Sequence, residues 1–275
     1  MITAGVDVGS LSAKAVIMDD GKVLASAIIL TTPDSEASAR MVMDKALRQA
    51  KLNLSDMQYI VGTGYGRVNI PFVNGTVTEI SCHAKGAQAQ NANVRTILDM
   101  GGQDCKAIRC DQMGRVVNFV MNDKCAAGTG RFLERIAAAI NCPLDQIGFR
   151  SLQGVNKDLP ISTTCAVFAE ADILKLIRNG EELNDILAGA FDSLVHRIQG
   201  LLSRVGVEEV LCISGGVAKN IGIVKRLEKN LGREVFLSDD PQLVGAFGAA
   251  LIALDRFKSQ TSPKHNRMHG GTFKD

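Results

Sequence analysis

The chain opens with apolar positions in the spacing of β-strands. Residues 2–8 form an alternating apolar stretch, and a second β-rich run follows at residues 15–18 after a short polar loop. The turn Asp19-Asp20-Gly21 ends that run, as expected for a β-hairpin. The start of the chain is therefore predicted to be antiparallel strands.

The same opening occurs a second time further along the chain. Asp7-Val8-Gly9-Ser10-Leu11-Ser12-Ala13-Lys14 realigns with Asp99-Met100-Gly101-Gly102-Gln103-Asp104-Cys105-Lys106 in the frame D-x-G-[SG]-x-x-x-K. In both copies an apolar strand precedes the Asp, a β-rich run follows the Lys, and a turn comes next. This internal repeat predicts two lobes, each beginning with a hairpin.

Helical periodicity occupies much of the remainder. One apolar face at positions 39, 42, 43, 46, 47 and 50 follows the capping residues Asp34 and Ser35. Further helices are predicted at residues 132–140, 184–205 and 218–231, with short strands at 210–213 and 235–237 and a last, small-residue helix opened by Pro241. We assign residues 1–95 to an N-terminal lobe, 96–258 to a C-terminal lobe and 259–275 to a polar tail, where His265 and His269 give little support for a metal site.

Composition excludes several functional classes. The 275 residues are 46% apolar, which suits a packed core, and 31 Lys and Arg against 29 Asp and Glu leave a net charge of only +2. Nothing there indicates nucleic-acid binding, and no window resembles a membrane span, so we expect a cytoplasmic protein. The seven cysteines are an odd number in an unsecreted chain, which favours core thiols or ligands over a disulfide framework.

The repeated loops have the chemistry of phosphate binding. A Gly after an Asp at a strand end lets backbone N–H groups approach anionic oxygens, and the carboxylate can hold a hydrated magnesium ion. Asp7 and Asp99 are thus candidates for organising the metal and the attacking water. The candidate nucleotide contacts in the two loops are Gly9, Ser10, Leu11, Ser12, Ala13, Lys14, Gly101, Gly102 and Gln103.

A single D-x-G segment is more often only a tight turn, but two copies a lobe apart favour a clamp on a triphosphate. The Gly-rich segment at residues 62–66 follows a short strand, and we interpret it as a turn, with a contact on the nucleotide side as the alternative. Neither a Walker motif nor G-x-G-x-x-G after a strand is present.

With Ser214-Gly215-Gly216-Val217-Ala218-Lys219-Asn220 added, the chain resembles the superfamily of sugar kinases, actin and chaperone ATPases. This resemblance implies an α/β, two-lobed actin-like ATPase fold in which each lobe is a ribonuclease-H-like mixed sheet with helices. It places ATP between the lobes, with Gly215 and Gly216 against the adenosine and Gln242 lining the same pocket.

Two cysteines stand where a loop is predicted to become a helix. Cys125 lies in N-D-K-C-A-A-G-T-G-R-F-L-E and Cys165 in S-T-T-C-A-V-F-A-E. A helix N-terminus stabilises a thiolate and an anionic cluster. A cluster normally takes four thiolates, so a symmetric dimer would supply the missing pair. The alternative is that both are ordinary small buried residues, which is our interpretation of Cys82, Cys105, Cys110, Cys142 and Cys212.

These two motifs closely resemble the activators of 2-hydroxyacyl-CoA dehydratases, a family that includes the ATPase subunits of benzoyl-CoA reductase and activators of double-cubane cluster proteins. The similarity runs from Val6 to about Leu254. It implies a homodimer with one 4Fe-4S cluster held by Cys125 and Cys165 of each chain, Thr129 at the nucleotide, and ATP or ADP with magnesium. It also implies ferredoxin or flavodoxin as reductant, and electron delivery to a dehydratase-like or double-cubane partner when ATP changes the angle between the cluster-bearing helices.

This sequence departs from the usual motifs of the family at Ser10-Leu11-Ser12 and at Asp104-Cys105. Those differences bear on the partner and the substrate, not on the fold. Two rival functions remain open at this point. One is a small-molecule kinase of the same fold, which would need no cysteine pair, and the other is a non-enzymatic assembly or sensing protein that uses nucleotide only to dimerise.

Overall fold

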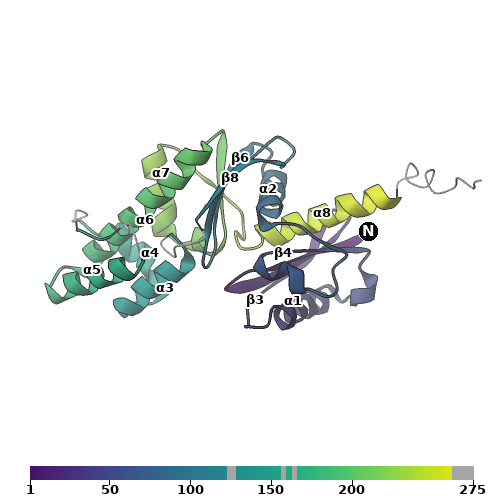
Figure 1. The fold of residues 1–275 in the computed structure, drawn as a ribbon, viewed down its shortest axis with the longest axis horizontal. Coiled ribbons are helices and arrows are strands. Elements are labelled where there is room, and N and C mark those ends of the chain that lie inside the picture. Colours follow the sequence, from purple (N-terminus) through teal and green to yellow (C-terminus); the bar gives the residue numbers. More distant parts are fainter. Residues whose placement is uncertain (123–127, 156–158, 163–165, 262–275) are drawn as a thin grey trace, which may run out of the picture. The chain divides into compact units, whose positions relative to one another are not determined.

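Both predicted hairpins are present, and each one belongs to a five-stranded mixed sheet (Figure 1). The computed structural model describes residues 1–122, 128–155, 159–162 and 166–261. The strand orders are β3-β2-β1-β4-β5 and β8-β7-β6-β9-β10, so β6 to β10 repeat the arrangement of β1 to β5. The internal repeat of the sequence is therefore a repeat of the fold.

The chain divides into two compact units, Met1–Gly86 with the segment from Gly245 onward, and Ala87–Val244. The elements of unit 1 are β1 (Ile2–Val8), β2 (Ser12–Asp19), β3 (Lys22–Leu30), α1 (Ser35–Ala50), η1 (Leu54–Asp56), β4 (Tyr59–Thr63), η2 (Tyr65–Asn69), β5 (Gly75–Thr76), most of α2 (Glu79–Gln90) and α8 (Val244–Thr261). Those of unit 2 are β6 (Val94–Met100), β7 (Cys105–Cys110), β8 (Val116–Asn122), α3 (Gly130–Ala139), α4 (Leu144–Leu152), α5 (Ala166–Arg178), α6 (Leu183–Val205), β9 (Val210–Ser214), η3 (Gly216–Lys219), α7 (Ile221–Leu231) and β10 (Phe236–Leu237).

The unit boundaries differ from the lobes expected from sequence. The change of unit falls within α2, and residues 245–258, which we expected in the second lobe, lie in the first. The reason is packing: Gly5 on β1 has no side chain, and a Cβ there would lie 2.1 Å from the carbonyl oxygen of Ala246 on α8. The small-residue helix therefore packs directly on the first strand. It also continues to Thr261, into the segment predicted to be a polar tail.

Local sequence signals account for many element ends. The β2–β3 turn has Asp20 at φ 44° and Gly21 at φ 86°, two successive positive φ values that suit the primed turns of hairpins. Asp34 caps α1 by accepting from the N–H of Ala37, as its position predicts. The helix predicted at 184–205 is α6, whereas the helix predicted at 218–231 begins only at Ile221 because Asn220 caps it there.

In unit 1 the two faces of the sheet are covered by different helices. Alternate residues of β1 point to opposite faces, and Ala4, Val6 and Val8 belong to the core formed with α1. The intervening positions face α8, since the hydroxyl of Thr3 donates to the carbonyl of Ala250 at 3.4 Å and Gly5 contacts the same helix. Asp7, the next residue in this alternation, therefore lies on the α8 face.

The core of unit 2 is built around α6. Phe191 and Leu194 of this helix belong to one buried cluster with Leu98 and Met100 of β6. Phe191 is fully buried, which stabilises the fold by about 2–3 kcal/mol relative to an exposed side chain. By the same alternation, Asp99 points to the sheet face opposite to this core.

Candidate functional site

The first phosphate loop joins β1 to β2. Asp7 stands directly opposite Lys14 in the antiparallel register, and the Nζ of Lys14 lies 3.1 Å from Oδ2 of Asp7. The carboxylate is only 4% exposed, so its charge is held by a partner and not by water. The N–H of Gly9 donates to the carbonyl of Ser12 at 3.0 Å, which closes the loop and leaves Ser10 and Leu11 half-buried at its tip.

The end of β4 lies against this loop. Thr63 is the parallel neighbour of Asp7, and Gly64 follows with φ 85° and ψ −180°, a backbone conformation open essentially only to Gly. A Cβ on Gly64 would lie 2.4 Å from the carbonyl oxygen of Val8 and 2.5 Å from Oδ1 of Asp7. The sequence favours a turn for this Gly-rich segment over a contact on the nucleotide side. Its likeness to Ser214-Gly215-Gly216 was the signal that could have placed it beside Asp7.

The second loop repeats this arrangement in unit 2. Asp99 stands opposite Lys106, and Gly101 N–H donates to the carbonyl of Asp104 at 3.0 Å. Lys106 forms a close ion pair with Asp104 and a second one, at 3.7 Å, with Asp99. All three charged groups are buried. The second loop therefore has two buried carboxylates beside one ammonium group, whereas the first loop has one carboxylate, Asp7, beside one ammonium group, Lys14. Gln103, by contrast, is exposed.

The Gly-Gly loop after β9 is the counterpart of Gly64. Ser214 is the parallel neighbour of Asp99 and donates its hydroxyl to Oδ1 of Asp99 at 3.2 Å. Gly215 has φ 86° and ψ 176°, and a Cβ there would lie 2.3 Å from the carbonyl oxygen of Met100. A Cβ on Gly216 would lie 3.5 Å from Nε2 of Gln242. The structure thus brings Gly215, Gly216 and Gln242 together beside Asp99.

The second loop is also joined to the start of α3. The N–H groups of Gly130 and Arg131, at the first turn of that helix, donate to the carbonyls of Gly101 and Gly102, each at 2.9 Å. Thr129, the N-cap residue, is fully buried at the same place. The sequence motifs include Thr129, Gly101 and Gly102 but do not predict these bonds, because every residue except Pro has the same backbone donor and acceptor.

The two proposed cluster ligands, Cys125 and Cys165, lie outside the described residues. The other five cysteines are free and buried, as predicted for core residues. Burial raises the pKa of Cys82 and of Cys212 to about 12 and that of Cys110 to about 11, and it raises the pKa of Cys105 further still. Burial thus disfavours the thiolate form of these four side chains, as suits core residues.

Within the described part of the chain, no three His, Cys, Asp or Glu side chains gather as a metal-binding group. Asp7 and Asp99 nevertheless suit magnesium, which is typically held by one or two carboxylates together with water and substrate phosphate. Among the helices that the structure describes, none is long and apolar enough to cross a membrane.

Comparison with known proteins gives consistent matches over nearly the full length. The sequence profile of the BadF/BadG/BcrA/BcrD ATPase family matches residues 4–253. An activator of lactoyl-CoA dehydratase from Anaerotignum propionicum is 43% identical over 255 residues, which are 93% of this chain and 98% of that protein.

Two solved structures have the same fold. Component A of (R)-2-hydroxyglutaryl-CoA dehydratase from Acidaminococcus fermentans superposes with a TM-score of 0.89 at 36% identity, covering 94% of this chain and 99% of that one. An activator of 2-hydroxyisocaproyl-CoA dehydratase from Clostridium difficile with bound ADPNP gives 0.88 at 36% identity, and both chains are covered completely. The expected actin-like ATPase fold is confirmed by these matches.

Proposed function

The chain belongs to the BadF/BadG/BcrA/BcrD ATPase family, and from that premise we propose that it is an ATP-dependent activator of a 2-hydroxyacyl-CoA dehydratase or a related reductase. In this proposal ATP hydrolysis drives a low-potential electron from a 4Fe-4S cluster in the activator to the partner enzyme. The names of the relatives support the activator role, and the bound ADPNP of the Clostridium difficile protein supports the nucleotide.

The observation that carries the proposal is the pair of backbone hydrogen bonds between the second phosphate loop and the start of α3. The carbonyls of Gly101 and Gly102 accept from the first turn of α3, whose first residue, Gly130, follows Cys125 by four intervening residues. A shift of this loop on nucleotide binding or hydrolysis would therefore pull directly on the helix that follows a proposed cluster ligand. A kinase of the same fold would have no use for such a connection to a cysteine.

In this proposal the nucleotide is bound by residues of the two phosphate loops and of the Gly-Gly loop. Backbone N–H groups near Gly9 and Gly101 would face phosphate, with Lys14 as a nearby positive charge, and Gly215, Gly216 and Gln242 would face adenosine. Asp7 and Asp99 would orient the metal and the attacking water. Magnesium, when bound, would neutralise phosphate charge.

The cluster would be held between two copies of the chain. Cys125 and Cys165 supply two thiolates, and a four-thiolate site needs a second chain. The surface of α5, the helix that begins one residue after Cys165, supports this. Its buried face includes Ala169, Ile173 and Leu176, while another face exposes the apolar side chains of Val167, Phe168, Leu174 and Ile177. A second copy would cover this face. Ferredoxin or flavodoxin is the proposed reductant, and the cytoplasm the proposed location.

The test uses anaerobically reconstituted protein, a purified 2-hydroxyacyl-CoA dehydratase, a reductant and ATP. We expect the dehydratase to become active only with ATP, and about four irons per dimer. Cys125→Ala and Cys165→Ala should each lose the iron and the activation but keep ATP binding, since neither residue belongs to a phosphate loop. Cys212→Ala is the matched control and should retain the iron. Four irons per monomer, or iron retained in both Cys125 and Cys165 variants, would contradict the shared cluster.

The catalytic assignment is tested separately with Asp7→Asn and Asp99→Asn. Each should reduce steady-state ATP hydrolysis by about 100-fold or more while changing the thermal midpoint far less, because one positioned charge-stabilising group is lost. Unchanged turnover in both variants would remove these residues from the mechanism.

A further inference from the structure

Asp104 is a buried carboxylate in the second phosphate loop, and neither the sequence motifs nor the proposed mechanism gives it a role. It stands just before β7 and forms a close ion pair with Lys106, the second residue of that strand. Both side chains are almost completely buried. Because a buried charge is costly unless it is paired, the contacts of Asp104 indicate what it does.

The first loop lacks this carboxylate and so serves as an internal comparison. In the repeated frame D-x-G-[SG]-x-x-x-K, the position of Asp104 is occupied by Ser12. The Nζ of Lys14 lies 3.1 Å from Oδ2 of Asp7, which is within hydrogen-bond distance. Where the loop has a serine, the lysine is thus bound directly to the aspartate at the end of the strand.

In the second loop the equivalent lysine lies further from the equivalent aspartate. The Nζ of Lys106 is 3.7 Å from Oδ2 of Asp99, which is too far for a hydrogen bond, whereas it donates a hydrogen bond to Oδ2 of Asp104. Asp104 therefore competes with Asp99 for the same ammonium group, and Asp104 has the shorter contact.

The neighbouring hydroxyl groups differ in the same way. Ser214 is the parallel neighbour of Asp99 and donates to its Oδ1 at 3.2 Å. Thr63 is the parallel neighbour of Asp7, but no hydrogen bond joins these two described residues. The carboxylate with the longer lysine contact is thus held by a hydroxyl, which orients the carboxylate without cancelling its charge.

We infer that Asp104 is a positioning residue for Asp99: it holds Lys106 away from the Asp99 carboxylate, which keeps its charge for magnesium. The inference rests on the proposed role of Asp99 in ATP hydrolysis. It also gives the two loops different partners. The first loop, with one ammonium group for one carboxylate, suits phosphate, and the second, with an additional carboxylate, suits the cation. Asp99, Asp104 and Lys106 all lie within unit 2, so their arrangement does not depend on how the two units are placed.

The first test is Asp104→Asn, which removes the charge and keeps the shape of the side chain. Lys106 should then pair directly with Asp99, as Lys14 pairs with Asp7. We expect the turnover number for ATP hydrolysis to fall about 10- to 100-fold, with little change in the KM for ATP, because a supporting residue acts through the group that it orients. Asp104→Ser copies the first loop and should behave in the same way, so the comparison survives if one variant does not fold.

The second test removes the ammonium group as well. If Asp104 acts by holding Lys106, the double variant Asp104→Asn with Lys106→Met should regain most of the turnover that Asp104→Asn loses, since nothing then neutralises Asp99. A pair that serves only the stability of the fold would give a double variant no better than the single one. Thermal midpoints identify any variant that is merely unfolded.

Magnesium dependence gives a measurement that does not use turnover. The protein is melted with saturating ADP at increasing Mg²⁺, and the Mg²⁺ concentration that gives half of the stabilisation is compared between variants. We expect this concentration to rise about 10-fold in Asp104→Asn and to return close to the wild-type value in the double variant.

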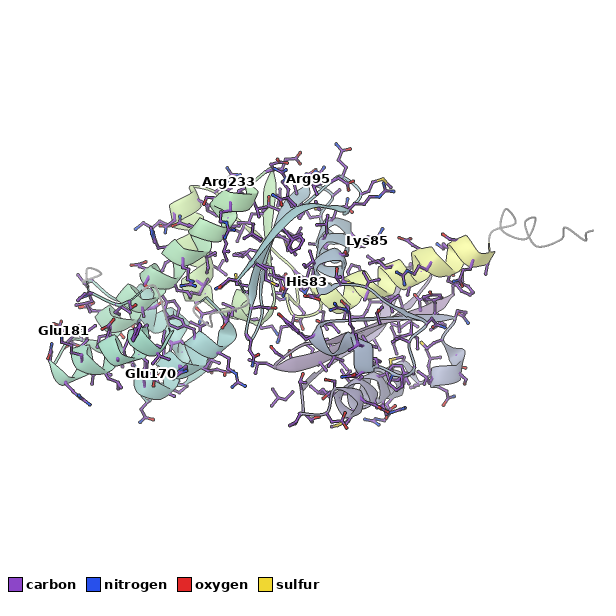
Figure 2. The ribbon with its side chains drawn as sticks, viewed as in Figure 1. His83, Lys85, Arg95, Glu170, Glu181 and Arg233 are labelled. Carbon is purple, nitrogen blue, oxygen red and sulfur yellow. The ribbon has the colours of Figure 1, made fainter. Side chains whose placement is uncertain are left out.

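The control removes a carboxylate from another ion pair of unit 2. Glu209 lies 3.8 Å from Arg95, and Figure 2 shows Arg95 near the beginning of β6, the other end of the strand from Asp99. Glu209→Gln should keep wild-type turnover and magnesium dependence. Wild-type turnover in Asp104→Asn, or a double variant no more active than Asp104→Asn, would overturn the inference and leave the role of Asp99 intact. Wild-type turnover in Asp99→Asn would instead refute the catalytic assignment of Asp99.

Discussion

At the scale of single residues, two glycines shape the surroundings of the two catalytic candidates, Asp7 and Asp99, as much as the charged groups do. Gly64 and Gly215 have nearly the same backbone conformation, with φ near 85° and ψ near 180°, in the two repeated sheets. A Cβ at either position would lie within 2.4 Å of a carbonyl oxygen at the end of the strand that carries a catalytic candidate. A side chain at either position would push Asp7 or Asp99 out of place.

We therefore predict that Gly64→Ala and Gly215→Ala each lower the free energy of unfolding by about 1–3 kcal/mol and abolish most ATP hydrolysis, since this backbone region strains any residue with a Cβ. Chemical denaturation and steady-state assays would measure both effects. Gly200→Ala is the control: this site lies inside α6 with nothing within 4 Å of the added Cβ. There the substitution should instead stabilise the protein by about 1 kcal/mol. Equal stability of all three variants would contradict the strain argument.

The buried cysteines give a second prediction at this scale. Their raised pKa values keep Cys82, Cys110 and Cys212 protonated, so native protein at pH 8 should resist alkylation at these positions while denatured protein reacts. Mass spectrometry after iodoacetamide treatment would locate the labelled thiols. Rapid labelling of any of the three in native protein would show that it is accessible.

The raised pKa values of these thiols also predict how the free energy of unfolding changes with pH. The folded chain holds these protons above pH 9.0, the ordinary value, where the unfolded chain releases them. The contribution of these buried thiols to the free energy of unfolding is fully present below pH 9. It decreases as the pH rises toward their pKa values in the folded protein, which are about 12. The free energy of unfolding should therefore fall above about pH 9, and Cys212→Ala should reduce that fall.

At the scale of elements, the start of α3 is bonded to the second candidate phosphate loop and follows a proposed cluster ligand in the chain. Gly130 is the first residue of the helix, a position where Pro is tolerated because its missing N–H is not part of the helix ladder. Thr129 before it is extended, at φ −122° and ψ 170°, as the residue before a Pro should be. The bond to Gly101 can thus be removed without breaking the helix.

We predict that Gly130→Pro keeps ATP binding but reduces the effect of ATP on the rate at which a chelator removes iron from the reconstituted protein. Gly130→Ala keeps the N–H, and the added Cβ meets nothing closer than 3.4 Å, so it should behave like the wild type. The measurement is the ratio of anaerobic chelation rates with and without a non-hydrolysable ATP analogue. Identical ratios in the Pro and Ala variants would exclude this bond from the coupling.

At the scale of the whole molecule, the exposed apolar face of α5 predicts the oligomeric state. Phe168 is 62% exposed three residues after Cys165, so a charge there should oppose the proposed dimer. We predict that Phe168→Asp is monomeric by analytical ultracentrifugation and binds no cluster. The variant should still unfold in a cooperative thermal transition, because the substituted side chain lies on the surface of the monomer. Phe149→Asp, equally exposed at 62% but on α4, is the comparison and should remain dimeric. A dimeric Phe168→Asp would place the interface elsewhere.

The sequence by itself determined the features that depend on neighbours in the chain. The D-x-G frame and its Lys predicted both hairpins, because strand alternation and turn residues are local properties. The periodicity at residues 184–205 predicted α6, and Asp34 predicted the start of α1 for the same reason. The motif resemblance predicted the family, which the comparisons confirmed.

The tertiary structure alone decided what lies against what. The contact of Gly64 with Asp7 and the return of α8 to the first unit both join residues that are distant in the chain. The bonds from α3 to Gly101 and Gly102 are made by backbone groups that every residue possesses. No residue type signals such contacts, because their partners are selected by packing after the local elements have formed.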